Sequence, residues 1–154
     1  MPVLVVETAH ALKEYVGKEI GVSEWMVVTQ GRINQFAEAT EDRQWIHLDR
    51  ERAQRESPFG RTIAHGFLTL SLVSRLMKGV VQIGSGVLLT VNYGLNRVRF
   101  PSAVGEGSRI RGRFVLLRLQ DVGEAQEAVF TCTVECEGSS KPCCVAEWIV
   151  RYYK

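Results

Sequence analysis

Alternation of apolar and polar residues dominates the second half of the chain. A period of two is typical of β-strands with one buried face. It predicts four strands, over residues 87–100, 107–119, 127–137 and 145–153. Pro101 ends the first strand, and turns containing Gly123 and Gly138 predict hairpins between the other three. A shorter alternating segment, residues 23–28, predicts one more strand early in the chain.

Helical periodicity replaces this alternation at residues 30–40. Thr29 is a suitable N-cap for the helix, and its apolar residues recur at i, i+3 and i+4, namely Ile33, Phe36 and Ala37. The polar run at residues 41–44 shows no further apolar periodicity. We therefore expect the helix to end just before this run.

Three other helices are predicted. Residues 8–16 form a short amphipathic helix that Gly17 ends, and residues 50–55 form a charged one capped by Asp49. Residues 66–79 carry apolar side chains on nearly every side, so this longest helix is expected to be buried on most of its faces. A buried helix followed by long antiparallel strands predicts an α+β fold in which the sheet wraps around that helix.

The composition fits one globular domain spanning residues 1–154. The chain is 45% hydrophobic and 23% charged, with a net charge of only +2, so nothing indicates nucleic acid as a partner. No apolar run approaches the roughly 20 residues that span a bilayer. The N-terminus has no basic segment followed by an apolar one, as a secretory signal would. These features predict a cytoplasmic protein that makes no membrane contact.

The four cysteines do not suggest a metal site. Cys132 and Cys136 share one face of a predicted strand, about 13 Å apart, which is too far for a direct disulfide. Cys143 and Cys144 are adjacent and are expected to point to opposite faces. No histidine lies near them, and their spacing fits no common zinc pattern. We expect small reduced thiols in or near the core, while a disulfide between strands stays open.

A carboxylate and an imidazole follow the helix at residues 30–40. Ile46 and Leu48 flank His47 and are expected to face inward from an extended segment, so that Asp42 and His47 converge at the edge of the core. An Asp/His pair around a bound water can take a proton from that water and return one to a substrate carbon. The alternative is structural: Asp42 merely ends a helix, and His47 is a hydrogen-bonded residue at the margin of the core.

A second block, Ile63-Ala64-His65-Gly66, opens the longest helix. Taken with Phe36-Ala37, Asp42 and His47-Leu48-Asp49, it resembles the motif of the MaoC-like dehydratases, the (R)-specific enoyl-CoA hydratases. The run Gln44-Trp45-Ile46-His47 and residues 92–101 make the chain similar to the branch of nodulation protein N. Many members of the family carry Asn-Pro where this chain has Gln44-Trp45, and this departure concerns the acyl-chain preference more than the chemistry.

The resemblance implies a fold, an activity and partners. The fold is the hotdog fold, an antiparallel sheet wrapped around a long central helix, which usually pairs edge to edge as a homodimer. The activity is that of a lyase of fatty acid metabolism, the reversible syn addition of water to trans-2-enoyl thioesters. The substrate is an acyl thioester of coenzyme A or acyl carrier protein. Coenzyme A enters only as part of this substrate, and neither another cofactor nor a metal is expected.

The resemblance also assigns roles to residues. Asp42 and His47 hold the water, with Asp42 as base and His47 orienting the water and carrying a proton to the α-carbon. The backbone N–H of Gly66 donates to the oxyanion. Ser74 falls where the family has a serine that supports the site. It lies roughly 12 Å along the helix from Gly66, so it either braces the loop of Asp42 or bonds back to its own helix. His65 is expected to bond a backbone group near the helix start.

Several alternatives remain open. A hotdog thioesterase would cleave the same substrates, but it typically needs a carboxylate on the central helix, and residues 66–79 contain none. A non-catalytic acyl-thioester-binding protein is a second possibility. A metal site is a third, with the candidate ligands Asp42, His47, Asp49 and His65. The row of arginines at 109, 111 and 113 either contacts the phosphates of coenzyme A or forms a solvated strand face.

Overall fold

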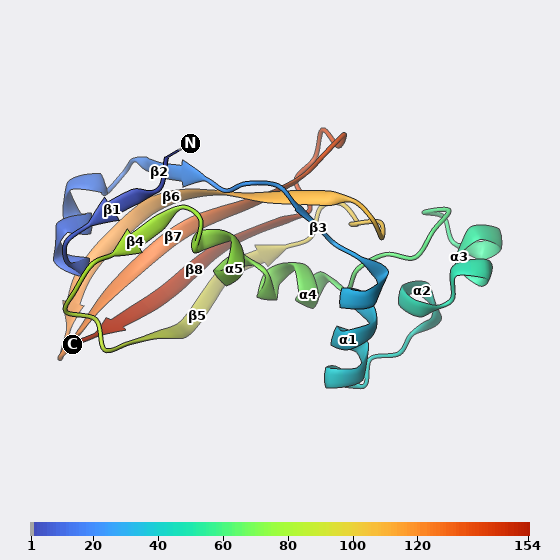
Figure 1. Cartoon of the computed structure of the whole chain (residues 1–154), viewed down its shortest axis with the longest axis horizontal. Coiled ribbons are helices and arrows are strands. Elements are labelled where there is room, and N and C mark those ends of the chain that lie inside the picture. Colours follow the sequence, from blue (N-terminus) through green and yellow to red (C-terminus); the bar gives the residue numbers. More distant parts are fainter. Residues whose placement is uncertain (1) are drawn as a thin grey trace.

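An antiparallel sheet of six strands forms the body of the molecule, which is described here by a computed structural model covering residues 2–154 (Figure 1). Its strands follow the order β2-β6-β7-β8-β5, and β3 pairs with β6. The strands are β2 (Glu19–Val22), β3 (Met26–Val27), β5 (Leu89–Arg99), β6 (Arg109–Val122), β7 (Ala125–Cys136) and β8 (Cys144–Tyr153). The four long strands confirm the alternating pattern, whereas β2 was not predicted and the segment 23–28 forms only the two-residue β3.

The alternation of side chains explains which face of the sheet is buried. In β8 the residues Ala146, Trp148, Val150 and Tyr152 are buried, and the residues between them are half-buried. The hairpins at Gly123 and Gly138 are confirmed, with φ of +59° and +81°, a region that glycine enters without steric cost. A separate pair of parallel strands, β1 (Leu4–Val6) and β4 (Val81–Ile83), lies beside this body.

The predicted helix 66–79 is present but interrupted. It divides at Leu72 into α4 (Gly66–Ser71) and α5 (Val73–Met77). Serines on both sides of the break donate back to carbonyls of the preceding turn, Ser71 Oγ to Phe67 O and Ser74 Oγ to Ser71 O, and such bonds bend helices. The prediction that most faces are buried was wrong. One face packs against the sheet, while the face that carries Phe67 is exposed.

Four helices remain, and three of them lie where local signals predicted them. The four are the 3-10 helix η1 (Ala9–Tyr15), α1 (Gln30–Thr40), α2 (Trp45–Leu48) and α3 (Arg50–Glu56). Thr29 caps α1 by accepting a hydrogen bond from Arg32 N at 3.1 Å, and Asp49 caps α3 through Arg52 N at 3.0 Å. The extended segment expected around His47 was wrong, because Trp45–Leu48 is the short helix α2.

The helices α1, α2 and α3 form an extension beyond the end of the sheet (Figure 1). The chain leaves the body after β3, passes through all three helices and returns to α4. Three backbone hydrogen bonds hold the returning segment: Ile63 N to Ile46 O at 3.1 Å, Ala64 N to Val104 O at 2.8 Å and Glu106 N to Thr62 O at 2.9 Å. The extension is therefore fixed to the body close to the start of α4. No helix among residues 2–154 is long and apolar enough to cross a membrane.

The cysteines and the arginine row have structural surroundings. All four cysteines are free and buried, and burial raises the pKa of Cys143 to about 12 and that of Cys144 to about 11, so neither is a ready nucleophile.

The arginines of β6 pair with carboxylates of neighbouring strands: Arg109 with Glu137, Arg111 with Glu135, and Arg113 with Glu135 and Glu19. These partners leave the arginine row ion-paired along the sheet.

Candidate active site

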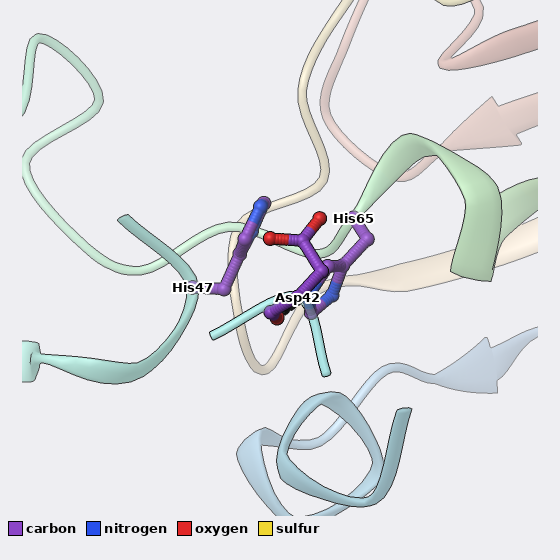
Figure 2. Close-up of side chains that lie close together, drawn as sticks. All are labelled: Asp42, His47 and His65. Carbon is purple, nitrogen blue, oxygen red and sulfur yellow. Dashed lines mark hydrogen bonds between the residues drawn. The ribbon is translucent and has the colours of Figure 1, made fainter. Parts of the chain in front are cut away.

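Three side chains converge where the extension meets the body. Asp42 follows α1, His47 lies in α2, and His65 is the N-cap of α4. One potential ligand atom from each lies within 4.8 Å of those of the other two. Figure 2 shows the carboxylate of Asp42 next to the ring of His47, with the ring of His65 close by. The expected convergence of Asp42 and His47 is thus confirmed, and His65 joins them, as the metal-site alternative had included it.

The end of α1 directs Asp42 toward the site. Glu41 adopts the left-handed conformation, with φ 61° and ψ 15°, and so turns the chain out of the helix. Thr40 Oγ1 then accepts a weak hydrogen bond from Asp42 N at 3.4 Å. The carboxylate itself is exposed. The turn therefore presents a solvated carboxylate against a pair of buried rings.

Hydrogen bonds fix the tautomer of His47, which is only 6% exposed. Its Nδ1 lies 2.7 Å from Ile63 O. A carbonyl can only accept, so Nδ1 carries the proton and Nε2 keeps a lone pair in the neutral ring. Gln30, the first residue of α1, donates to His47 O at 2.7 Å and accepts from the buried Thr62. Sequence reasoning missed this support by Gln30, because it joins residues far apart in the chain.

The surroundings keep His47 neutral. Burial lowers the pKa of its imidazole from the ordinary value of 6.5, and the neighbouring His65 lowers it further. The hydrogen bond to Ile63 O and the charge of Asp42 act in the opposite direction, but burial is the largest contribution. At neutral pH the ring is therefore a base with a free lone pair on Nε2.

A cavity of about 250 Å³ lies between α4, α5 and the strands β5 and β8. Leu70 and Ser74 line it on the helix side, and Ala146 and Trp148 on the sheet side. These two helix residues follow Gly66 at intervals of four, so they share its face of the helix. The Oγ of Ser74 donates to Ser71 O at 3.3 Å. Of the two alternatives for Ser74, the bond back to its own helical segment is the one observed, and the residue also lines the cavity.

Gly66 is the first residue of α4, so its N–H has no acceptor within the helix. Phe100 packs directly against it: a Cβ at this position would lie 3.1 Å from the ring. Two reasons for a glycine are therefore present together. One is the close contact with Phe100, and the other is an N–H at a helix start that a substrate oxygen can approach.

The three converging side chains do not form a good metal site. Two of their ring nitrogens already face carbonyls, His47 Nδ1 and His65 Nε2. The two remaining nitrogens belong to rings stacked 3.7 Å apart at 20°. Lone pairs in nearly parallel planes cannot both point at one ion about 2 Å from each nitrogen. The fourth candidate ligand, Asp49, instead caps α3.

The fold and this site define a hotdog protein with a carboxylate and a neutral imidazole beside a helix start. The chain belongs to the MaoC-like domain family, whose profile, described as "MaoC like domain", matches residues 11–137. This membership confirms the resemblance found in its motifs.

Two relatives agree with this assignment, and a solved structure shares the fold. The chain is 50% identical over 147 residues to 3-hydroxyacyl-thioester dehydratase Z of Mycobacterium tuberculosis (strain ATCC 25618 / H37Rv), covering 95% of this chain and 96% of that protein. It is 50% identical over 136 residues to nodulation protein N of Rhizobium leguminosarum bv. viciae, covering 87% and 84%. The fold is similar to the (R)-hydratase from A. caviae involved in PHA biosynthesis, with a TM-score of 0.70, 24% identity and coverage of 88% and 94%.

Proposed function

We propose that this protein is a reversible hydratase/dehydratase that joins trans-2-enoyl thioesters and (R)-3-hydroxyacyl thioesters. The observation that carries the proposal is the convergence of the Asp42 carboxylate with a neutral His47 next to the start of α4. The name of the dehydratase from Mycobacterium tuberculosis, which is 50% identical over 95% of this chain, supports the same reaction. The cavity along α4 and α5 offers an apolar path for the acyl chain.

The geometry supports a mechanism with one water molecule. A carboxylate oxygen of Asp42 and the lone pair of His47 Nε2 each accept a hydrogen bond from this water. His47 Nε2 takes one proton as the water oxygen bonds to the β-carbon, and the electrons of the C=C bond move toward the thioester oxygen to give an enolate. The protonated Nε2 then returns that proton to the α-carbon. Oxygen and proton reach the same face of the double bond, so the addition is syn and both side chains regain their starting states.

This mechanism moves the role of base from Asp42 to His47, which keeps the proton transfer to the α-carbon that the resemblance suggested. The neutral tautomer of His47, with its proton on Nδ1 toward Ile63 O, leaves Nε2 as an acceptor for the first proton. Asp42 orients the water and balances the positive charge that forms on the imidazole. The N–H of Gly66 donates to the thioester oxygen, where negative charge develops in the transition state.

An absorbance assay at the enoyl-thioester band tests the proposed reaction. Crotonyl-CoA and a series of longer trans-2-enoyl-CoAs are expected to lose this band in the presence of the protein, and (R)-3-hydroxyacyl-CoA is expected to regain it. A folded protein that changes none of these substrates would contradict the proposal. A saturated acyl-CoA serves as the control, because release of free thiol from it would indicate a thioesterase instead.

The same proposal includes the setting of the reaction. The acyl group is carried on coenzyme A or acyl carrier protein, and the residues of the site perform the reaction with neither a metal nor a separate cofactor. The pathway is fatty acid metabolism, and the compartment is the cytoplasm. The four free thiols support this location, because unpaired cysteines suit a reducing compartment.

The acidic limb of the pH profile is expected below pH 6.5. His47 must be neutral to take the proton from water, and burial lowers its pKa from 6.5. As the pH falls, the ring therefore stays neutral through 6.5 and gains its proton only at the lowered pKa. The measurement is kcat/KM against pH, which reports ionisations of the free enzyme. A midpoint above 6.5 would argue against His47 as the base, and the residual activity of His47→Asn should lack this limb.

We propose further that two copies associate through β5. This strand is an edge of the sheet, bonded to β8 alone within residues 2–154, and it exposes the large apolar side chains of Leu89, Val91, Tyr93 and Leu95. An unpaired edge with apolar side chains is a template for another strand. The homodimer expected for a hotdog protein would cover this edge.

Sedimentation analysis is expected to give twice the mass of one chain. Combining Leu89→Lys with Val91→Lys should reduce the measured mass to that of one chain, because charges on an edge strand oppose pairing. The matched control is Val5→Lys on β1, which is 65% exposed and lies in the other sheet. A wild-type protein with the mass of one chain would overturn the proposed dimer.

A further inference from the structure

His65 is the one buried residue of the cluster that the mechanism above leaves without a task. It is only 3% exposed, although histidine is a polar side chain. Its Nε2 lies 2.9 Å from the carbonyl oxygen of Asp42, 23 residues earlier in the chain. Because that carbonyl can only accept, Nε2 carries the proton and Nδ1 holds a lone pair. This Nδ1 is the one buried side-chain nitrogen or oxygen in the described part of the chain that has no hydrogen-bond partner.

The ring of His65 also supports the ring of His47. The two imidazoles stack with centroids 3.7 Å apart and planes at 20°. Phe36 of α1 packs against the same ring of His65, with centroids 4.9 Å apart at 57°. The ring of His65 is therefore held between a residue of α1 and His47 of α2, while its own backbone opens α4. One side chain thus connects the three elements that carry Asp42, His47 and Gly66.

This placement controls the distance between the carboxylate of Asp42 and the ring of His47, on which the reaction depends. Asp42 lies on an exposed turn, and within that turn its backbone makes only the weak bond from its N–H to Thr40 Oγ1. The bond from His65 to the carbonyl of Asp42 is shorter and comes from the rigid start of a helix. The stacking of the His65 ring on the His47 ring in turn fixes the plane of the His47 ring. A shift of about 1 Å between catalytic groups can cost about 100-fold in rate.

We propose that His65 is a positioning residue, whose Nε2–H holds the main chain of Asp42 while its ring fixes the plane of His47, so that both reach one water molecule. The inference rests on the hydratase function proposed above and adds to it a residue that touches neither water nor substrate. The unpartnered Nδ1 fits this role. Burying a nitrogen without a hydrogen-bond partner costs free energy, so an apolar ring would fill the core better. A ring that must both donate from Nε2 and stack on His47 is confined to an orientation in which Nδ1 has no partner.

Two substitutions separate the two contacts of His65. His65→Gln keeps an N–H donor for the carbonyl of Asp42 but loses the flat ring. His65→Phe keeps a flat ring against His47 but loses the donor. Each variant is expected to fold and to lower kcat by about 10- to 100-fold, while KM changes little because the acyl cavity is untouched. His10→Gln is the matched control. His10 is exposed and bonds to Gln126 of β7, and neither residue belongs to the cluster of Asp42, His47 and His65. This variant should keep wild-type kcat.

Nuclear magnetic resonance supplies a readout that does not depend on turnover. The chain has only three histidines, so their ring nitrogens can be assigned individually. Neutral His65 is expected to carry its proton on Nε2, and the ring protons of His47 are expected to shift more in His65→Gln than in His65→Phe, because stacking on an aromatic ring is lost only in the first. A proton on Nδ1 of His65 in the wild-type protein would overturn the proposal even if neither variant folds.

The outcomes separate this proposal from the proposed function. A folded wild-type protein that hydrates no enoyl thioester rejects the function. An active wild-type protein whose two folded His65 variants keep wild-type kcat rejects the positioning role alone. A lowered kcat with an unchanged KM and a displaced His47 signal supports the role.

Discussion

Replacing Asp42 by Asn is expected to lower kcat for enoyl-CoA hydration by about 10²–10⁴-fold. The amide keeps the shape of the carboxylate but cannot balance the positive charge that forms on His47 or orient the water through a charged acceptor. The stability of the fold should hardly change, because the side chain of Asp42 is exposed. His65 bonds to the main-chain carbonyl of Asp42, which the substitution retains. The measurement is the initial rate of loss of the enoyl-thioester band at saturating substrate.

Asp49→Asn is the matched control for this substitution. Asp49 is exposed and lies in the same extension, but its carboxylate caps α3 through Arg52 N. Asn is about as good an N-cap as Asp, so this variant should keep wild-type kcat and stability. Equal losses in the two variants would show that Asp42 has no special role.

A double variant tests whether Asp42 and His47 act as one unit. His47→Asn keeps an amide that can donate to Ile63 O but removes the lone pair of Nε2. Residues that act together in one step show strongly non-additive losses. Adding Asp42→Asn to His47→Asn is therefore expected to lower kcat far less than it does in the wild-type background. Fully additive losses would contradict a shared water molecule.

Gly66→Pro is expected to lower kcat by about 10²–10³-fold, as the loss of one oxyanion donor typically does. Gly66 is the first residue of α4, where proline is well tolerated because the missing N–H has no partner in the helix. His65 has φ −59° and ψ 137°, a conformation that the residue before proline readily adopts. The substitution thus removes one N–H with little change to the backbone.

Gly66→Ala controls for the added Cβ. Both variants place a Cβ about 3.1 Å from the ring of Phe100, so in both that ring must move by a few tenths of an ångström to accept the Cβ. Only proline removes the N–H. Alanine is expected to retain most of the activity, and the ratio of kcat between the two variants measures the contribution of the donor. Equal activities in two folded variants would leave the contact with Phe100 as the sole reason for this glycine.

Local patterns were sufficient for much of the fold. The four long strands, their glycine hairpins and the two capped helices α1 and α3 follow from a period of two, from turn residues and from N-caps such as Thr29 and Asp49. Each of these signals acts over a few neighbouring residues. The pattern failed where local and distant interactions compete, as in α2, which is helical although Ile46 and Leu48 suggested an extended segment.

The burial of the longest helix shows a second kind of failure. Its apolar composition predicted contact on most faces, yet Phe67 is 69% exposed. Composition shows that burying an apolar side chain is favourable. It does not show whether another part of the chain is available to cover that side chain. The sheet covers one face of α4 and α5 only. For the same reason spacing could not decide between the two alternatives for Ser74, which bonds back to Ser71 O and lines the cavity.

The sequence by itself determined the strands, the caps, the family motif and the candidate pair of Asp42 and His47, because these depend on neighbours in the chain or on matching residue types. The tertiary structure alone decided that Ile63 O selects the tautomer of His47, that burial keeps this imidazole neutral, and that His65 stacks on it while holding Asp42. Those features require segments far apart in the chain to meet. The tautomer and the pKa of His47 depend on the acceptors, charges and excluded water around its ring, and distant segments of the chain supply them.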